Sequence, residues 1–202
     1  MKIFLLRHGR TAYNDLRRYQ GKLDLPLSRE GAEELSAADF SPAQVYVSPL
    51  LRARQTARIL FPTAEQLVVD AFAEMDFGDF DGRSADEMAG DAAYRAWVEG
   101  GCTGRCPNGE SLAEFCARSC RAFAALLDRA AAEKQDRLVV LAHSGTLRAV
   151  MERFSLPPCG YFEVNPPPGG GFVLDCEPAA RKDGRRLVLL ETVQYGKEET
   201  GC

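Results

Sequence analysis

The chain contains little histidine and no long apolar run. Histidine occurs twice in 202 residues and tryptophan once. A helix that spans a membrane needs about 20 consecutive apolar residues, and no stretch approaches that length, so we expect no membrane partner. The apolar run at residues 3–6 is too short for a signal-peptide core, and the Arg-His-Gly that follows it is no cleavage site. We therefore expect a cytoplasmic protein.

The sequence also lacks an excess of positive charge. Its formal net charge is −4 at pH 7, which argues against a broad basic face for general nucleic-acid binding but leaves room for a local basic pocket. The Walker pattern G-x-x-x-x-G-K-[ST] does not occur, so a P-loop nucleotide enzyme is excluded. Hydrophobic residues make up 46% of the chain, enough to form a core. The length favours one domain over residues 1–202.

Cysteine is more frequent, with seven residues. An odd number fits free thiols in a reducing compartment better than a disulfide framework. Two pairs have C-x3-C spacing, Cys102/Cys106 and Cys116/Cys120, which is compatible with zinc. The second pair lies one turn apart within a helical pattern, where cysteine is a small apolar residue. Two histidines cannot form a tri-histidine zinc site, so we expect neither metal nor cofactor.

Strand-like and helix-like patterns alternate along the chain, and Ser28 is placed to cap one of the helices. The alternation predicts an α/β layered fold with a largely parallel sheet. Residues 71–110 are irregular, acidic and Gly-rich, and we interpret about 83–110 as a cap or insertion. Strands are predicted at 3–7, 44–47, 66–69, 138–142, 172–176 and 186–193, and helices at 29–38, 51–60, 91–98, 111–134 and 146–154.

Both histidines follow directly after a predicted strand. In α/β folds, ligands bind beyond the carboxyl ends of the strands. Three strand ends therefore bring histidines and arginines to one region, where a helix also begins. The free N–H groups and the dipole of that helix favour an anion, so the region is a candidate phosphate site. The candidate residues are Arg7, His8, Arg10, Arg52, His143, Ser144 and Gly145.

Five motifs occur in order between residues 7 and 148. Together they resemble the histidine phosphatase superfamily, the phosphoglycerate mutase-like proteins. This resemblance implies a three-layer αβα sandwich with a mostly parallel central sheet. The motifs are RHG-x-T-x-x-N at 7–14, S-x-L-x-R-A-x-Q-T-A at 48–57, the acid segment EMDFGDFDG at 74–82, P-x-G-E-S at 107–111 and AHSGTLR at 142–148.

The resemblance implies that His8 is the nucleophile, which attacks phosphorus and becomes phosphohistidine. This chemistry needs a neutral imidazole whose other nitrogen is held protonated, for example by the carbonyl of Gly9. Arg7 and Arg52 would hold the phosphoryl oxygens, because guanidinium groups match them and stay charged. His143 and Asn14 would add further donors.

The resemblance also implies an acid. Glu74 would protonate the leaving oxygen and then help water to attack phosphohistidine, which requires a raised pKa. Asp76 in the same acidic loop is the alternative. Arg10 stands where the family often has Glu or Gln, and it adds charge near the pocket mouth. Glu110 either belongs to the site or occupies the first turn of a helix, where negative charge is favourable.

Three functions follow from this interpretation. The first is a phosphomonoester hydrolase without a cofactor, with a small-molecule phosphomonoester as its partner and either a monomer or a homodimer as its state. The compact length and the EMDFGDF…PNGES run look most like alpha-ribazole phosphatases of cobalamin biosynthesis. The second is a phosphoglycerate mutase, although residues 83–110 contain only three basic residues, Arg83, Arg95 and Arg105. The third is an inactive phosphate-binding module.

Overall fold

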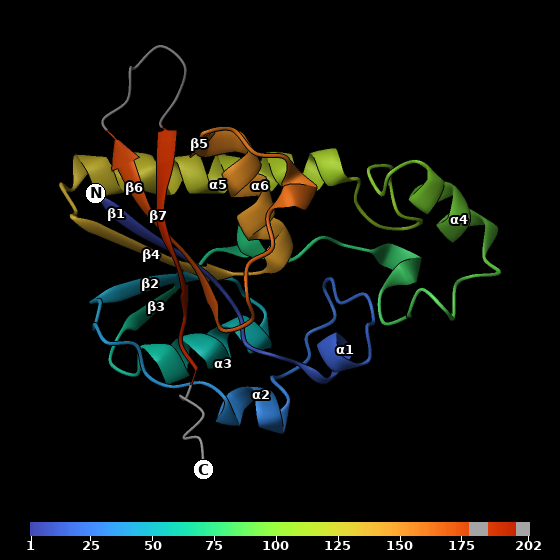
Figure 1. Cartoon of the computed structure of the whole chain (residues 1–202), viewed down its shortest axis with the longest axis horizontal. Coiled ribbons are helices and arrows are strands. Elements are labelled where there is room, and N and C mark those ends of the chain that lie inside the picture. Colours follow the sequence, from blue (N-terminus) through green and yellow to red (C-terminus); the bar gives the residue numbers. More distant parts are fainter. Residues whose placement is uncertain (178–185, 197–202) are drawn as a thin grey trace.

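The computed structural model of the protein describes residues 1–177 and 186–196. A seven-stranded sheet has the order β3-β2-β4-β1-β6-β7-β5 and forms the middle layer of the molecule (Figure 1). The strands are β1 (Lys2–Arg7), β2 (Gln44–Val47), β3 (Glu65–Val68), β4 (Arg137–Ala142), β5 (Ser155–Leu156), β6 (Gly170–Glu177) and β7 (Arg186–Gln194).

The strand pairing is mostly parallel. β1 pairs with β4, β4 with β2, and β2 with β3, all in parallel, whereas β6 runs antiparallel to both β1 and β7. The helices are α1 (Ala12–Asp15), α2 (Arg29–Glu33), α3 (Leu51–Leu60), α4 (Ala92–Glu99), α5 (Leu112–Ala132) and α6 (Ser144–Phe154), with 3-10 turns η1 (Asp70–Phe72), η2 (Gly78–Phe80) and η3 (Tyr161–Glu163).

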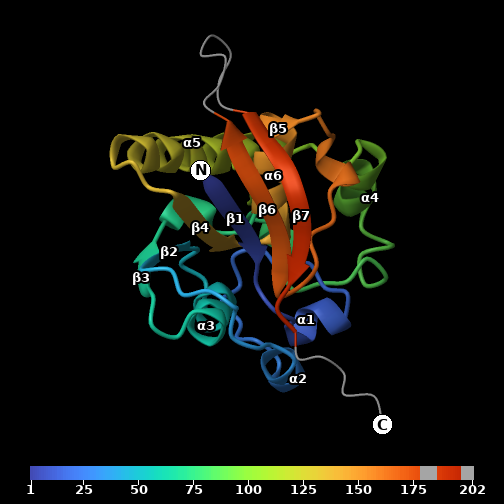
Figure 2. The same ribbon diagram turned by 60° about the vertical axis from the view of Figure 1, so that its left-hand side comes forward.

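The helices cover both faces of the sheet. α5 and α6 lie on one face and α2 and α3 on the other (Figures 1 and 2). Successive side chains of a strand point to opposite faces, so β1 and β4 contribute to two separate cores. Ile3 and Leu5 pack with α5 and α6, whereas Leu6 packs with α3, and all three are fully buried. This arrangement confirms the predicted three-layer fold.

A third apolar cluster lies away from the sheet, in the region that carries α4. Its members come mainly from residues 75–116, and α4 extends to one side of the sheet layers (Figure 1). Tyr94 and Trp97 of α4 contact Phe80 of η2, with ring centroids 5.4 and 5.5 Å from the Phe80 ring, and both are buried. The segment interpreted as a cap therefore packs around its own aromatic cluster.

The predicted helix at 29–38 is too long. Ser28 caps α2 as expected, because its Oγ accepts from the Gly31 N–H at 2.9 Å. The helix ends at Glu33, after which Leu35 bridges to Gly196 and the Ser36 N–H donates to the Tyr195 carbonyl. Contacts with the chain that follows β7 thus override the helical pattern. No helix within the described residues is long and apolar enough to cross a membrane.

Candidate active site

The carboxyl ends of three neighbouring strands place the central side chains of the site. β1 and β4 are in register from Lys2–Arg137 to Arg7–Ala142, and the His8 N–H donates to the Ala142 carbonyl at 3.0 Å. His8 and His143 therefore leave the sheet side by side. Their rings meet edge to face with centroids 5.1 Å apart. At the end of β2, the Ser48 N–H donates to the Leu141 carbonyl at 3.0 Å.

The contacts of His8 fix its tautomer. Its Nδ1 lies 2.6 Å from the Gly9 carbonyl oxygen. A carbonyl only accepts, so Nδ1 carries the proton and Nε2 keeps a lone pair. Burial, assisted by the charges of Arg52 and Arg7, holds the pKa of His8 well below its usual range. The ring is thus neutral near pH 7 and has one nucleophilic nitrogen.

A buried and a partly buried guanidinium group supply positive charge. Arg52 of α3 is fully buried and donates to the carbonyls of Leu23 and Gly21, both at 2.8 Å. Arg7 donates to the Pro166 carbonyl at 3.0 Å. Both are anchored by carbonyls rather than carboxylates, so their charge is available to an anion. Burial lowers the pKa of Arg52 to about 10, at which the group is still charged near neutral pH.

Several nitrogen atoms of these side chains are buried without a partner. Nε of Arg7, Nε of Arg52 and Nδ1 of His143 have no hydrogen-bond partner among the described residues. Buried polar atoms are almost always paired, so such a group of atoms needs an explanation. All three atoms belong to residues whose charges or rings act on His8.

Glu74 is buried and bound by backbone donors. Its Oε1 accepts from the Met75 N–H at 3.0 Å, and its Oε2 accepts from the Gly145 N–H at 3.2 Å. Burial raises the pKa of Glu74, whereas the Met75 N–H, Arg52, the Gly145 N–H and Arg7 lower it, and the net shift is upward. The direction is the one that a general acid requires.

The loop that carries Glu74 is held by Arg118 of α5. Arg118 donates to the carbonyls of Ala71, Ala73 and Glu74 at 2.7–2.9 Å and forms a two-pronged ion pair with Glu110. Glu110 in turn accepts from the Asp76 N–H at 2.9 Å. Glu110 thus helps Arg118 to hold the loop that carries Glu74. Arg118 is not among the residues predicted from the sequence, although a charged residue next to the buried stripe of a long amphipathic helix was a usable signal.

The remaining candidates have other partners. Arg10 forms ion pairs with Glu34 at 2.7 Å and Asp15 at 3.1 Å at a partly exposed position. Oδ1 of Asn14 accepts from the Thr11 N–H in the capping box of α1. The structure therefore places both next to the first histidine motif, but engaged in local contacts.

The first turn of α6 is also partly engaged. The Gly145 N–H, which we expected to bind substrate, donates to Glu74 in the structure. Ser144 is half-buried beside it. The helix N-terminus thus stabilises the carboxylate form of the acid.

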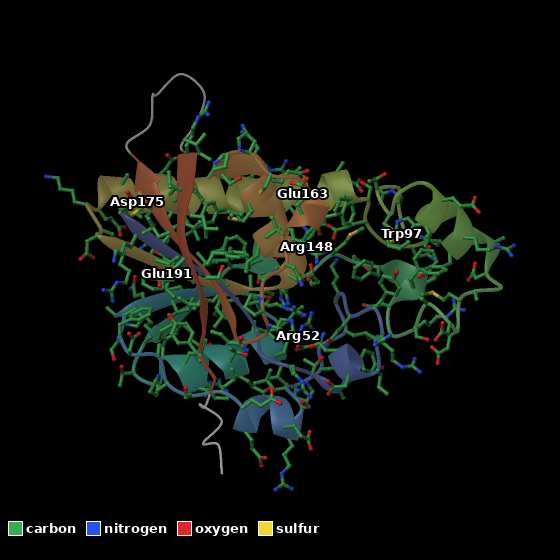
Figure 3. All side chains as sticks on the ribbon, in the orientation of Figure 1. Arg52, Trp97, Arg148, Glu163, Asp175 and Glu191 are labelled. Carbon is green, nitrogen blue, oxygen red and sulfur yellow. The ribbon has the colours of Figure 1, made fainter. Side chains whose placement is uncertain are left out.

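A further arginine lies close to Arg7. Nε of Arg148 donates to the Val164 carbonyl at 2.8 Å, two residues before the carbonyl of Pro166 that binds Arg7. The charge of Arg148 contributes to a lowered pKa of Arg7, of which burial is the main cause. Figure 3 shows Arg148, from α6, above Arg52, from α3. Helices on opposite faces of the sheet thus direct cations toward the same edge.

The four cysteines of the two C-x3-C pairs are buried or partly buried. Burial raises the pKa of Cys106 and Cys120 to about 11 and that of Cys116 to about 12, so these side chains are protonated near neutral pH. Within residues 1–177 and 186–196, no group of three His, Cys, Asp or Glu side chains is arranged to hold a metal ion.

The chain is similar to known proteins over most of its length. The family model of the histidine phosphatase superfamily (branch 1) matches residues 3–180. The 2,3-bisphosphoglycerate-dependent phosphoglycerate mutase 2 of Gloeobacter violaceus is 31% identical over 164 residues, which cover 74% of this chain and 73% of that protein. An uncharacterized phosphatase of Bacillus subtilis, PhoE, is 29% identical over 160 residues, or 76% of this chain and 77% of that protein.

A solved structure has the same fold. The alpha-ribazole phosphatase from Shigella flexneri superposes with a TM-score of 0.81 over 98% of this chain and 100% of that chain, at 24% sequence identity. The family match spans all five motifs and the elements that position them. The chain is therefore an enzyme of the histidine phosphatase superfamily.

Proposed function

We propose that the protein is a phosphomonoester hydrolase that works through a phosphohistidine on Nε2 of His8. The observation that carries this proposal is the state of His8. Its Nδ1 is tied to the Gly9 carbonyl, its ring is neutral, and it stands beside two arginines anchored only by backbone carbonyls. A neutral nucleophile within a cationic pocket suits a phosphomonoester, which is close to dianionic near neutral pH.

The reaction has two steps in this proposal. Nε2 of His8 attacks phosphorus in line with the ester oxygen, and Arg7 and Arg52 stabilise the charge on the equatorial oxygens. Glu74 gives its proton to the departing alkoxide. In the second step Glu74, now ionised, takes a proton from water, which attacks the phosphohistidine and releases inorganic phosphate.

Most arginines of residues 83–110 are already engaged in ion pairs, which favours hydrolysis over mutase activity. A mutase must also hold a second acidic group of its substrate, which takes further basic residues. Arg83 pairs with Asp91 at 3.2 Å, and Arg105 pairs with Glu114. Arg95 is exposed on α4. Two of the three cations are thus already neutralised by acids of the same region.

We further propose alpha-ribazole phosphate as the first substrate to test. The compact chain and its acid and PNGES motifs are similar to those of alpha-ribazole phosphatases, and the Shigella flexneri enzyme shares the fold. The likeness to the Gloeobacter violaceus mutase makes mutase activity the second candidate.

A panel of phosphomonoesters tests both proposals. Alpha-ribazole phosphate, 3-phosphoglycerate, sugar phosphates and nucleotides are compared by kcat/KM for phosphate release. In parallel, 3-phosphoglycerate is followed for conversion to its 2-phospho isomer. Phosphate release that outpaces isomerisation supports the hydrolase. Isomerisation without release identifies a mutase, and the absence of both isomerisation and even a single burst of phosphate identifies an inactive binding module.

The covalent intermediate gives an independent test. Rapid quenching after brief incubation with labelled substrate should place the label on His8 in a form that is stable in alkali and lost in acid. The His8→Ala variant should lose both label and turnover. Label on a carboxylate or on His143 would overturn the assignment of roles.

A further inference from the structure

Ser48 makes a short buried contact with the second histidine. Its Oγ lies 2.6 Å from Nε2 of His143, and both residues are fully buried. Ser48 follows β2 and His143 follows β4, so the sheet itself sets this distance. The pair is 95 residues apart in sequence. The mechanism above assigns no role to Ser48.

The direction of this hydrogen bond follows from counting donors. The Leu50 N–H donates to Oγ of Ser48 at 3.3 Å, which uses one acceptor site of the hydroxyl. The hydroxyl keeps a second lone pair and its single hydrogen, and among the described residues the acceptor recorded within reach of that hydrogen is Nε2 of His143. In that arrangement Nε2 accepts, so the proton of the neutral imidazole sits on Nδ1.

The opposite arrangement would not suit an anion. If Nε2 carried the proton and donated to Ser48, Nδ1 would present a lone pair. Nδ1 is buried without a partner among the described residues, and His143 does not use its side chain to cap α6. Nδ1 belongs to the imidazole ring of His143. This ring meets His8 edge to face and feels the charges of Arg52 and Arg7. A lone pair there would repel phosphoryl oxygens, whereas an N–H would bind them.

We propose that Ser48 is a positioning residue that donates to Nε2 of His143 and so fixes the proton on Nδ1, which becomes a donor to the transferred phosphoryl group. This inference rests on the proposed function for its catalytic consequence, although the tautomer itself does not. Gly9 and Ser48 then have complementary roles in setting the tautomers of the two histidines. The carbonyl of Gly9 accepts from the Nδ1–H of His8, which leaves Nε2 of His8 as the nucleophile. The hydroxyl of Ser48 donates to Nε2 of His143, which leaves the proton of that ring on Nδ1 as a donor.

The tautomer can be read directly by NMR. The chain has only two histidines, so ¹⁵N-imidazole spectra contain two sets of signals, and His8→Asn assigns them. We expect both rings of the wild-type protein to carry the proton on Nδ1. In Ser48→Ala, the His143 signals should move toward a mixture of tautomers while those of His8 stay in place. A wild-type His143 with its proton on Nε2, or a tautomer unchanged in Ser48→Ala, overturns the proposal.

Kinetics and phosphate binding supply the second readout. Ser48→Ala should lower kcat/KM about 10- to 100-fold, which is less than the 10²–10³-fold cost in kcat of deleting a donor outright, and Ser48→Thr should recover part of it. Ser119→Ala is the matched control, because Ser119 is also fully buried but lies on α5. Inorganic phosphate added to the wild-type protein should shift the His143 Nδ1–H signal.

These measurements separate two kinds of failure. If no phosphomonoester is hydrolysed, the proposed function fails, but the spectra still report the tautomer and the phosphate titration still reports the donor. If turnover is normal and the Ser48→Ala spectrum equals that of the wild type, the proposed function stands and the role of Ser48 is refuted.

Discussion

Glu74 lies so close to Gly145 that position 145 has no room for a side chain. The Gly145 N–H donates to Oε2 of Glu74 at 3.2 Å, and a Cβ at position 145 would lie 2.4 Å from Oε1 and 3.0 Å from the ring of Phe115. The absence of a side chain at 145 is thus what allows the carboxyl group to reach the first turn of α6.

Gly145→Ala should therefore impair the acid without touching phosphate binding. The added methyl group forces the Glu74 carboxyl away from its place, so kcat/KM for an alkyl phosphate should fall toward the value of a Glu74 variant. The KM for p-nitrophenyl phosphate should change little. Gly90→Ala is the control, since a Cβ at position 90 meets nothing within 4 Å. Equal losses in the two alanine variants would contradict this account.

Much of this site was predictable from the sequence because the sheet dictates it. The strand at 44–47 was placed correctly, and β1, β3 and β4 each differ from prediction by a residue or so. Since parallel strands end at one edge, His8, Arg52 and His143 had to converge. The contact of Ser48 with His143 and those of Arg118 with the backbone carbonyls around Glu74 were not predictable, because they depend on side-chain directions between residues at least 44 positions apart.

Arg118 should matter for stability more than any exposed arginine of α5. Arg118→Met removes donors from three carbonyls and leaves Glu110 without its partner. Because the pair is about 80% buried, we expect the free energy of unfolding to fall by about 3 kcal/mol, measured by urea titration. Arg129→Met is the control. Arg129 pairs with Glu133 one turn away on the exposed face, where solvent screens the ion pair and it contributes little to stability. Similar losses of stability in both variants would show that Arg118 and Glu110 do not hold the loop of Glu74.

Substitution of Arg10, unlike that of Arg118, should have little effect on stability. Its side chain is 38% exposed and already paired with Asp15 and Glu34. Surface pairs of this kind contribute about 0–1 kcal/mol, so Arg10→Gln should leave both stability and kcat/KM for simple monoesters nearly unchanged. Substrates with a second anionic group provide the sensitive assay. A KM that rises for those substrates alone would show that Arg10 leaves its ion pairs to bind them.

Exhaustive chelation should leave turnover unchanged. In the proposed mechanism the positive charge at the phosphoryl group comes from Arg7 and Arg52, and His143 adds a neutral donor, so no metal ion is needed. Activity is measured after dialysis against EDTA and again after the addition of magnesium or zinc. Loss on chelation with recovery on adding either metal would contradict the mechanism and would redirect attention to the cysteine pairs.

The sharpest prediction concerns the leaving group. An alkoxide is a poor leaving group and needs a proton, whereas p-nitrophenolate departs readily without one. Glu74→Gln should therefore lower kcat/KM for an alkyl phosphate by about 10²–10⁴-fold, the usual range for general acid catalysis, and cost much less with p-nitrophenyl phosphate. The parameter must be kcat/KM, because kcat can report hydrolysis of phosphohistidine instead. Equal losses would make Asp76 the next candidate.

The pH dependence of kcat/KM is a second test of the role of Glu74. His8 must be neutral, and its lowered pKa places the loss of activity on the acid side well below pH 6.5. Glu74 must be protonated, and its raised pKa means that kcat/KM falls as pH rises through that value. In Glu74→Gln the alkaline fall should disappear while the acid fall remains. The ionisation of the substrate, with a second pKa of about 6, is common to both enzymes and cancels in their ratio. A ratio that does not vary with pH would show that the proton lost on the alkaline side does not belong to Glu74.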